Sequence, residues 1–211
     1  LLPKYRGSSP IQWAVINGEK QTGITIMKTA LGIDSGDILL QKVVDILPKE
    51  TAGQLFDRLA LEGAKTLAEA LKLIQSGQAT YIAQDERLAT HFPMLTKGDG
   101  KIDWTKSTKS IAQLVLGLNP WPSAYSFCNG KMLKIWDVDI VELSICNQIF
   151  NDNSAFANSP CGQTLVSGDQ LFVRCGDGIA QLNEVQLEGK KRMPAKEFLC
   201  GYNKANGFVL E

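Results

Sequence analysis

The run from Thr51 to Gly77 constrains the fold of this chain most strongly. Apolar and small residues recur in it at helical spacing, namely Phe56, Leu59, Gly63, Leu67, Leu71 and Ile74. Thr51 and Gln54 have the spacing of a capping box at a helix start, and Gly77 is the residue type that often follows a helix end. The run therefore predicts one long amphipathic helix.

Two segments before this helix are predicted to be β-strands. Residues 22–29 (TGITIMKT) alternate and contain β-branched side chains, and residues 38–46 (ILLQKVVDI) form a second apolar run. Further upstream, Ser9 and Pro10 have the residue types of an N-cap and a first helical position. A short helix is expected from there to about Asn17. Because strands and helices alternate, residues 1–82 are predicted to form an α/β domain.

The pattern changes in the second half of the chain. A helix is expected around residues 109–118, followed by short runs of β-type residues at 123–128, 131–142, 170–175 and 179–188. This succession predicts a mainly β domain over residues 101–211, a small barrel or sandwich. Residues 83–100 lack sustained periodicity and are expected to be an extended linker. The Asn- and Ser-rich stretch 144–162 is expected to be a long loop.

Composition excludes several classes of protein. Lys and Arg number 22 and Asp and Glu number 22, so net charge does not indicate a nucleic-acid partner, and only the local cluster 189–197 (GKKRMPAKE) is a candidate. The five cysteines include no CxxC or Cys/His pair, which disfavours a zinc site or disulfide scaffold and favours reduced thiols. The apolar runs are too short to predict a membrane span.

The loop at residues 32–37 (GIDSGD) is the first candidate for chemistry. Gly32 and Gly36 flank Asp34 at the end of a predicted strand, where α/β proteins often place functional groups. Taken alone, the loop favours an ordinary turn with solvated carboxylates, whereas a calcium loop would need further ligands. His91, the only histidine, is expected to be solvated or to pack.

Ten stretches, in this order along the chain, resemble the methionyl-tRNA formyltransferase family. They are LLPKYRG (1–7), PIQ (10–12), TGITIM (22–27), GIDSGD (32–37), QDE (84–86), IDW (102–104), NPWPSAY (119–125), EGKKRMP (188–194), EFL (197–199) and GY (201–202). The resemblance spans nearly the whole chain. It implies the second half of a Rossmann-like catalytic domain, followed by a C-terminal domain with an OB-like barrel.

The resemblance also implies an activity. The family transfers the formyl group of 10-formyltetrahydrofolate, a co-substrate, to the amino group of methionine on initiator tRNA, and no metal is implied. Its active site contains an Asn, a His and an Asp, and Asp34 matches the Asp. The Asn and His would lie upstream of position 1, so this sequence is expected to be part of a longer protein and inactive alone. Asp34 is expected to orient the His and organise a water.

Binding residues follow from the same resemblance. Leu1, Leu2 and Pro3 would border the folate, although loop packing explains these residues equally well. Lys190, Lys191 and Arg192 would contact tRNA phosphates, although a solvated turn is an alternative. The implied protein would be monomeric, without a membrane partner, in the bacterial cytoplasm or an organellar matrix or stroma. The α/β part without its upstream strands would expose apolar surface and self-associate.

Three other functions remain open. Relatives that share both domains include formyltransferases acting on an amino sugar nucleotide and the folate-hydrolysing domain of formyltetrahydrofolate dehydrogenase. NPWP (119–122) occurs across these relatives, while EGKKRMP (188–194) favours the tRNA enzyme. A non-catalytic tRNA-binding remnant is the alternative of another class.

Overall fold

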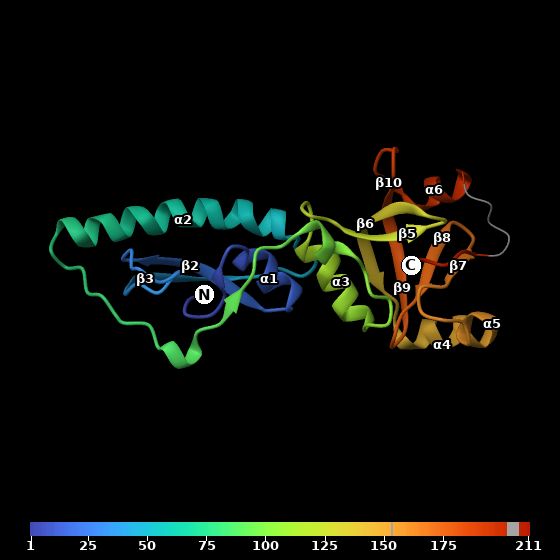
Figure 1. Ribbon diagram of the computed structural model, residues 1–211, viewed down its shortest axis with the longest axis horizontal. Helices are drawn as coiled ribbons and strands as arrows, with labels where there is room; N and C mark the ends of the chain where they lie inside the picture. Colours follow the sequence, from blue (N-terminus) through green and yellow to red (C-terminus); the bar gives the residue numbers. More distant parts are fainter. Residues whose placement is uncertain (153, 202–206) are drawn as a thin grey trace. The chain divides into compact units, whose positions relative to one another are not determined.

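The chain divides into two compact units, an N-terminal unit of residues Leu1–Leu95 and a C-terminal unit of residues Thr96–Glu211 (Figure 1). A computed structural model describes residues 1–152, 154–201 and 207–211. Tyr202, the last residue of the resembling stretches, therefore lies outside the described residues.

The N-terminal unit is a mixed α/β arrangement. Its elements are β1 (Arg6–Gly7), α1 (Pro10–Ile16), β2 (Gln21–Met27), β3 (Ile38–Asp45), α2 (Ala52–Gln75), the 3-10 helix η1 (Glu86–Leu88) and β4 (His91–Phe92). Strands β2 and β3 form an antiparallel hairpin, and β1 pairs with β4 in parallel. Helix α2 packs on both strands of the hairpin (Figure 1). These elements confirm the α/β expectation and the predicted strands.

Helix α2 begins as the sequence predicts, because the capping box of Thr51 and Gln54 is formed. The buried face matches the predicted one only in part: Leu59 is buried as expected, and Leu55, which lies outside the predicted pattern, is buried as well. Several large residues of the predicted apolar face are exposed, namely Phe56 (59%), Leu67 (48%), Leu71 (55%) and Ile74 (48%). The hairpin covers only one side of the helix, which leaves an apolar surface open.

Residues 83–95 are not a linker, contrary to the expectation for residues 83–100. They belong to the N-terminal unit, and residues 96–100 belong to the C-terminal unit. Within residues 83–95, β4 pairs with β1, and the side chain of Leu95 is buried. The missing periodicity reflects an irregular backbone, which packs through side chains and strand bridges rather than through a helical or alternating face.

The C-terminal unit is rich in antiparallel sheet. Its elements are η2 (Lys97–Gly100), α3 (Thr108–Gly117), β5 (Ala124–Cys128), β6 (Lys131–Ile140), α4 (Leu143–Asp152), α5 (Ser154–Ala157), β7 (Thr164–Ser167), β8 (Gln170–Arg174), β9 (Ile179–Leu187), β10 (Met193–Pro194) and α6 (Ala195–Gly201). The sheet order is β5-β6-β9-β8-β7, with β10 paired to β9. Four of the strands were predicted, whereas β7 and β10 are too short to show an alternating pattern.

The strands at the two ends of this sheet, β5 and β7, do not pair with each other, so the sheet is open and the expected OB-like barrel is not established. Both of its edges nevertheless bond to the last residues of the chain. At the β5 edge, Phe127 and Glu211 exchange two backbone hydrogen bonds of 3.0 Å. Near β7, the Thr164 N–H donates to Phe208 O at 2.9 Å, and the Leu210 N–H donates to Gly162 O at 2.8 Å.

The stretch 144–162, expected to be a loop, is largely helical. It contains most of α4 and all of α5, although residue 153 lies outside the described part. Cys146 and Phe156 are buried in a cluster with Phe172 and Ile179 of the sheet. The Asn and Ser content suggested a loop, but the apolar residues among them decide the structure because they pack against the sheet.

Candidate active site

Asp34 lies in the loop between β2 and β3 and has an uncommon backbone conformation. Its φ is 50°, in the left-handed region that Asp and Asn adopt more readily than most residues. The half-buried carboxylate accepts a hydrogen bond at Oδ2 from the backbone N–H of Gly7, at 2.9 Å. The side chain that the resemblance identifies is therefore held by a neighbouring strand.

Gly7 makes this hydrogen bond possible through a close approach to β4. Its φ is 122°, and a Cβ atom would lie 2.3 Å from the carbonyl oxygen of Phe92. Gly36 has a similar role in the loop, because a Cβ there would lie 1.7 Å from the carbonyl oxygen of Lys28. The glycines beside Asp34 therefore permit close packing, and the positive φ in this loop belongs to Asp34 itself.

Asp34 lines a cavity of about 260 Å³ that also contains two of the predicted folate-side residues. Leu1 and Leu2 line it together with Asp34, and Tyr5 and Thr25 are among its polar residues. The described lining does not include Pro3, whose carbonyl oxygen instead accepts the Thr90 N–H at 3.3 Å. The fold thus brings Asp34, Leu1 and Leu2 together.

A hydrogen-bonded network of Gln84 and Arg6 also supports this loop. Gln84 donates from Nε2 to the carbonyl oxygens of Asp34 and Gly36, at 2.8 and 2.7 Å. Its Oε1 accepts from Arg6, whose side chain is buried and forms an ion pair with Glu86 at 2.7 Å. The hydrogen bond between them raises the pKa of Arg6 and lowers the pKa of Glu86.

The sequence did not identify Arg6 or Gln84 as functional residues, although both stand in the resembling stretches. His91 is exposed on β4 beside Arg6 in the strand register. The only signal in the sequence that could have indicated Arg6 is the presence of a charged residue in the resembling stretch 1–7, next to residues expected to pack. The partners of Gln84 lie 50 and 78 positions away, so no local pattern reveals them.

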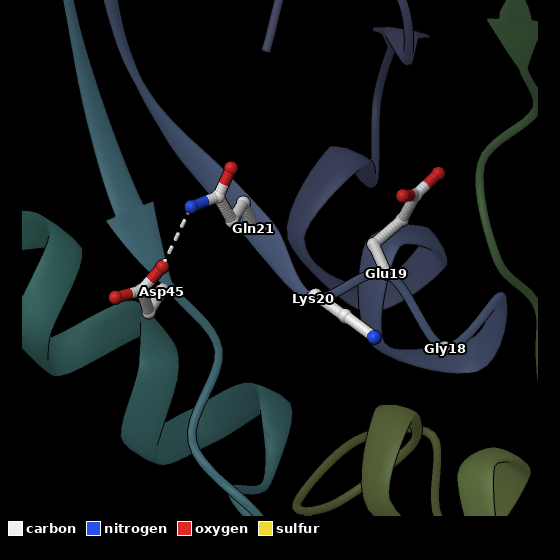
Figure 2. A pocket seen from close by; sticks show the side chains of 5 residues that line it. All are labelled: Gly18, Glu19, Lys20, Gln21 and Asp45. Atoms are coloured by element: carbon white, nitrogen blue, oxygen red, sulfur yellow. Dashed lines mark hydrogen bonds between the residues drawn. The ribbon is translucent and has the colours of Figure 1, made fainter.

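A second hollow of the N-terminal unit, of about 500 Å³, is lined by Gly18, Glu19, Lys20, Gln21 and Asp45. Figure 2 shows the Gln21 and Asp45 side chains facing each other, joined by a hydrogen bond of 2.8 Å. Glu19 points away from that pair in the same view and accepts a hydrogen bond from Tyr5 at 2.7 Å. This hollow contains no residue expected to be functional.

The predicted tRNA residues occupy the connection between β9 and β10. Lys190, Lys191 and Arg192 are all exposed. Arg192 forms an ion pair with Glu184, and its guanidinium lies 4.8 Å from the ring centre of Trp136. The three cations therefore differ, because Arg192 already has an acidic and an aromatic partner within the unit.

The remaining candidates for chemistry are few among the described residues. No group of three or more His, Cys, Asp or Glu side chains could hold a metal ion in that part of the chain. The five cysteines all lie in the described ranges and none is in a disulfide bond. Burial raises the pKa of Cys175 to about 12, which makes its thiol a poor nucleophile. No helix of the described ranges is long and apolar enough to cross a membrane.

Two family models match the chain. The model of the formyl transferase family covers residues 1–71, and the model of the formyl transferase C-terminal domain covers residues 94–203. Two curated relatives are methionyl-tRNA formyltransferases. The protein of Caldanaerobacter subterraneus subsp. tengcongensis is 43% identical over 211 residues, and that of Lachnospira eligens is 45% identical over 211 residues. Each match covers 100% of this chain and 64% or 65% of the relative's length, respectively.

Solved structures show the same fold at lower identity. The structure of HypX from Aquifex aeolicus in complex with tetrahydrofolic acid is 16% identical to this chain, with a TM-score of 0.66. The match covers 99% of this chain and 37% of the HypX chain. An N-formyltransferase from Helicobacter canadensis, with folinic acid and dTDP-3-aminofucose, is 17% identical, with a TM-score of 0.65. That match covers 91% of this chain and 63% of the other.

Proposed function

The chain belongs to the formyl transferase family, and on that premise we propose that it forms part of a methionyl-tRNA formyltransferase. The full-length protein would transfer the formyl group of 10-formyltetrahydrofolate to the amino group of methionine on initiator tRNA. The observation that carries this proposal is the 43% identity, over the whole chain, to a relative named for that activity. The chain spans about 64% of that relative, so the activity is proposed for the longer protein.

The chemistry requires one bond to form and one to break at the formyl carbon. The methionine nitrogen attacks this carbon, and negative charge develops on the formyl oxygen in a tetrahedral intermediate. The proton of the attacking nitrogen must reach the folate nitrogen as the bond between that nitrogen and the formyl carbon breaks. In the family, an Asn and a His provide the donors that stabilise this oxygen charge, and the resemblance places both upstream of position 1.

Asp34 has a supporting role in this scheme. Its carboxylate would orient the His, favour the protonated imidazole and organise a water for proton transfer. The hydrogen bond from the Gly7 N–H supports this role, because it fixes one carboxylate oxygen at the cavity. Without the Asn and His, the 211 residues alone are expected to be inert.

The cavity beside Asp34 would receive the reacting end of the folate. Its volume of about 260 Å³ is below the ~300–1,000 Å³ of typical small-molecule sites, so it would hold only part of such a ligand. Leu1 and Leu2 would contact the folate at this cavity. Pro3 would border the folate next to the cavity, because it is not among the residues that line it. The folate is a co-substrate in this proposal, and the scheme requires no metal.

The C-terminal unit would help to bind the tRNA. The exposed Lys190 and Lys191 are suited to phosphate contacts. Arg192 would contribute less, because the ion pair with Glu184 offsets its charge. The hydrogen bonds of residues 208–211 to both sheet edges support closure into an OB-like barrel. We take the two units as the catalytic part and the C-terminal domain of a monomeric protein in the cytoplasm or an organelle.

A formyltransferase acting on an amino sugar nucleotide is the second candidate. It is favoured by the shared fold with the Helicobacter canadensis enzyme, which was solved with dTDP-3-aminofucose. Hydrolysis of formyltetrahydrofolate is a third possibility, and a tRNA-binding role without catalysis is the fourth.

A substrate comparison separates these functions. The full-length protein is incubated with 10-formyltetrahydrofolate and, in turn, with methionyl initiator tRNA, with dTDP-3-aminofucose and with neither acceptor. Formylation of the tRNA alone supports the proposal. Formylation of the sugar would replace it by the second function. Release of formate at the same rate with and without an acceptor would replace it by the third. Tight binding of the tRNA without any formyl transfer would indicate the fourth.

A further inference from the structure

We propose that Gln84 is a positioning residue for the formyl transfer, which it serves by clamping the backbone of the loop that carries Asp34. The inference rests on the proposed function, because the role of Asp34 in the reaction comes from there. The clamp itself is a feature of the N-terminal unit, and it has a readout that does not depend on activity.

The side-chain amide of Gln84 uses both of its ends. Its Nε2 donates to the carbonyl oxygens of Asp34 and Gly36, at 2.8 and 2.7 Å. Its Oε1 accepts from Arg6 Nη2 at 2.8 Å and from Arg6 Nε at 3.3 Å. Because an arginine only donates and a carbonyl only accepts, this arrangement permits a single orientation of the amide.

Arg6 is held in turn by a charged partner. Its side chain is 3% exposed, and its Nη1 and Nη2 donate to the two carboxylate oxygens of Glu86 at 2.9 and 2.7 Å. Two parallel hydrogen bonds of this kind fix the plane of the guanidinium. The position of Gln84 is therefore set by a buried cation that has little freedom to move.

The network reaches Asp34 from two directions. Gln84 bonds to its main-chain oxygen, while Gly7, the residue after Arg6, donates to its carboxylate. Both contacts lead back to β1, because Gly7 belongs to that strand and Gln84 is held by Arg6 of the same strand, so the backbone and the side chain of Asp34 are fixed relative to one strand. This matters because the positive φ of Asp34 is a conformation that needs support from surrounding structure.

Gln84 acts through Asp34 rather than on a substrate. The described lining of the cavity includes Asp34 but not Gln84. A displacement of about 1 Å in a reacting constellation can reduce a rate about 100-fold. Loosening the clamp should therefore lower kcat while leaving substrate affinity nearly unchanged.

The test uses the full-length protein, with residues numbered as in this sequence. Gln84→Glu keeps an oxygen that can accept from Arg6. It places a second oxygen against the carbonyl oxygens of Asp34 and Gly36, so it removes the bonds to the loop and keeps the bond to Arg6. Gln84→Leu removes both contacts. Gln78→Glu is the matched control, because it makes the same chemical change at an exposed position of the same unit. Steady-state formyl transfer to methionyl-tRNA and the exchange of the Gly7 amide proton, followed by NMR, are measured.

The proposal expects Gln84→Glu to lower kcat about 100-fold, to change KM for tRNA and folate by less than about threefold, and to speed Gly7 exchange at least tenfold. Gln78→Glu should match the wild type in all three. Should Gln84→Glu fail to fold, Gln84→Leu takes its place with the same expectations. An unchanged kcat, or an unchanged Gly7 amide, in a folded variant would overturn the proposal.

The two proposals fail in different ways. A wild-type protein that does not formylate methionyl-tRNA, with Gly7 exchange still accelerated in Gln84→Glu, would overturn the proposed function and leave the clamp in place. An active wild type whose Gln84 variants keep full kcat would overturn the clamp and leave the proposed function in place. If the wild type is inactive and neither folded variant alters Gly7 exchange, both proposals are wrong.

Discussion

The backbone N–H of Gly7 donates a hydrogen bond to Oδ2 of Asp34 across 2.9 Å, although the two residues are 27 positions apart. This contact joins the short strand β1 to the loop between β2 and β3. It depends on the absence of a side chain at residue 7, since β4 passes directly against it. The geometry of the candidate active site is therefore linked to the stability of the N-terminal unit.

Gly7→Ala should destabilise the N-terminal unit by about 2–3 kcal/mol. The added Cβ would lie 2.3 Å from the Phe92 carbonyl oxygen, at a φ of 122°. Gly77→Ala is the control, because its φ is also positive but nothing lies within 4 Å, so it should cost only about 1 kcal/mol. Hydrogen exchange of α2 amides measures both free energies of unfolding. Equal effects of the two substitutions would contradict the steric account.

The pair of Glu50 and Arg58 should make the N-terminal unit sensitive to acid. Burial tends to raise the pKa of Glu50, but the hydrogen bonds from Arg58 and the Leu47 N–H outweigh it and lower the pKa below its usual 4.5. A lowered folded pKa contributes stability that is present above the unfolded value and is lost as the pH falls through the folded value.

Glu50→Gln should therefore flatten the acid side of the stability profile below about pH 4.5. The free energy of unfolding from α2 amide exchange, measured from pH 7 to pH 3, checks this. Glu69→Gln, at an exposed position of α2, should leave the profile as in the wild type. The same change of profile in both variants would show that general surface charge, and not the pair of Glu50 and Arg58, causes the acid sensitivity.

The 211-residue chain should self-associate through α2. The exposed side chains of Phe56, Leu67, Leu71 and Ile74 form an apolar face on this helix, and such surfaces promote association. Leu71→Lys should shift the chain toward monomer in sedimentation velocity, while Lys72→Ala, at an exposed neighbour, should not. A wild-type chain that stays monomeric at about 100 μM would contradict the expectation.

Lys190 and Lys191 should contribute to tRNA binding through phosphates. Replacing both by Ala should weaken binding of methionyl-tRNA and of unrelated tRNA alike, and should reduce the salt dependence of binding by roughly one to two phosphate contacts. Arg192→Ala should have a smaller effect, because Glu184 already pairs with it. Titrations of the full-length protein at several salt concentrations measure this. A larger loss for Arg192→Ala would reverse the assignment.

Much of the N-terminal unit could be predicted from the sequence because its signals are local. The capping box of Thr51 and Gln54 and the alternation in β2 act over a few residues, and both are present in the structure. The amphipathic face was less predictable. Which side of α2 is buried depends on what covers it, and Leu55 rather than Phe56 faces the unit.

The site was only partly predictable for a related reason. Asp34 could be identified through its resembling stretch, but its contacts with Gly7 and Gln84 join segments that are distant in sequence. Helices α4 and α5 were missed because Asn and Ser are common in loops, whereas the burial of Cys146 and Phe156 depends on the sheet. Tertiary packing decided these cases, and local composition does not encode it.

The most direct test of the account is formyl transfer from 10-formyltetrahydrofolate to methionyl initiator tRNA by the full-length protein, compared with its Asp34→Ala variant. We predict an active wild type, an Asp34→Ala variant slower by about 100-fold or more, and an inert 211-residue chain. A full-length protein that leaves methionyl-tRNA unformylated, or an Asp34→Ala variant with wild-type kcat, would contradict the account.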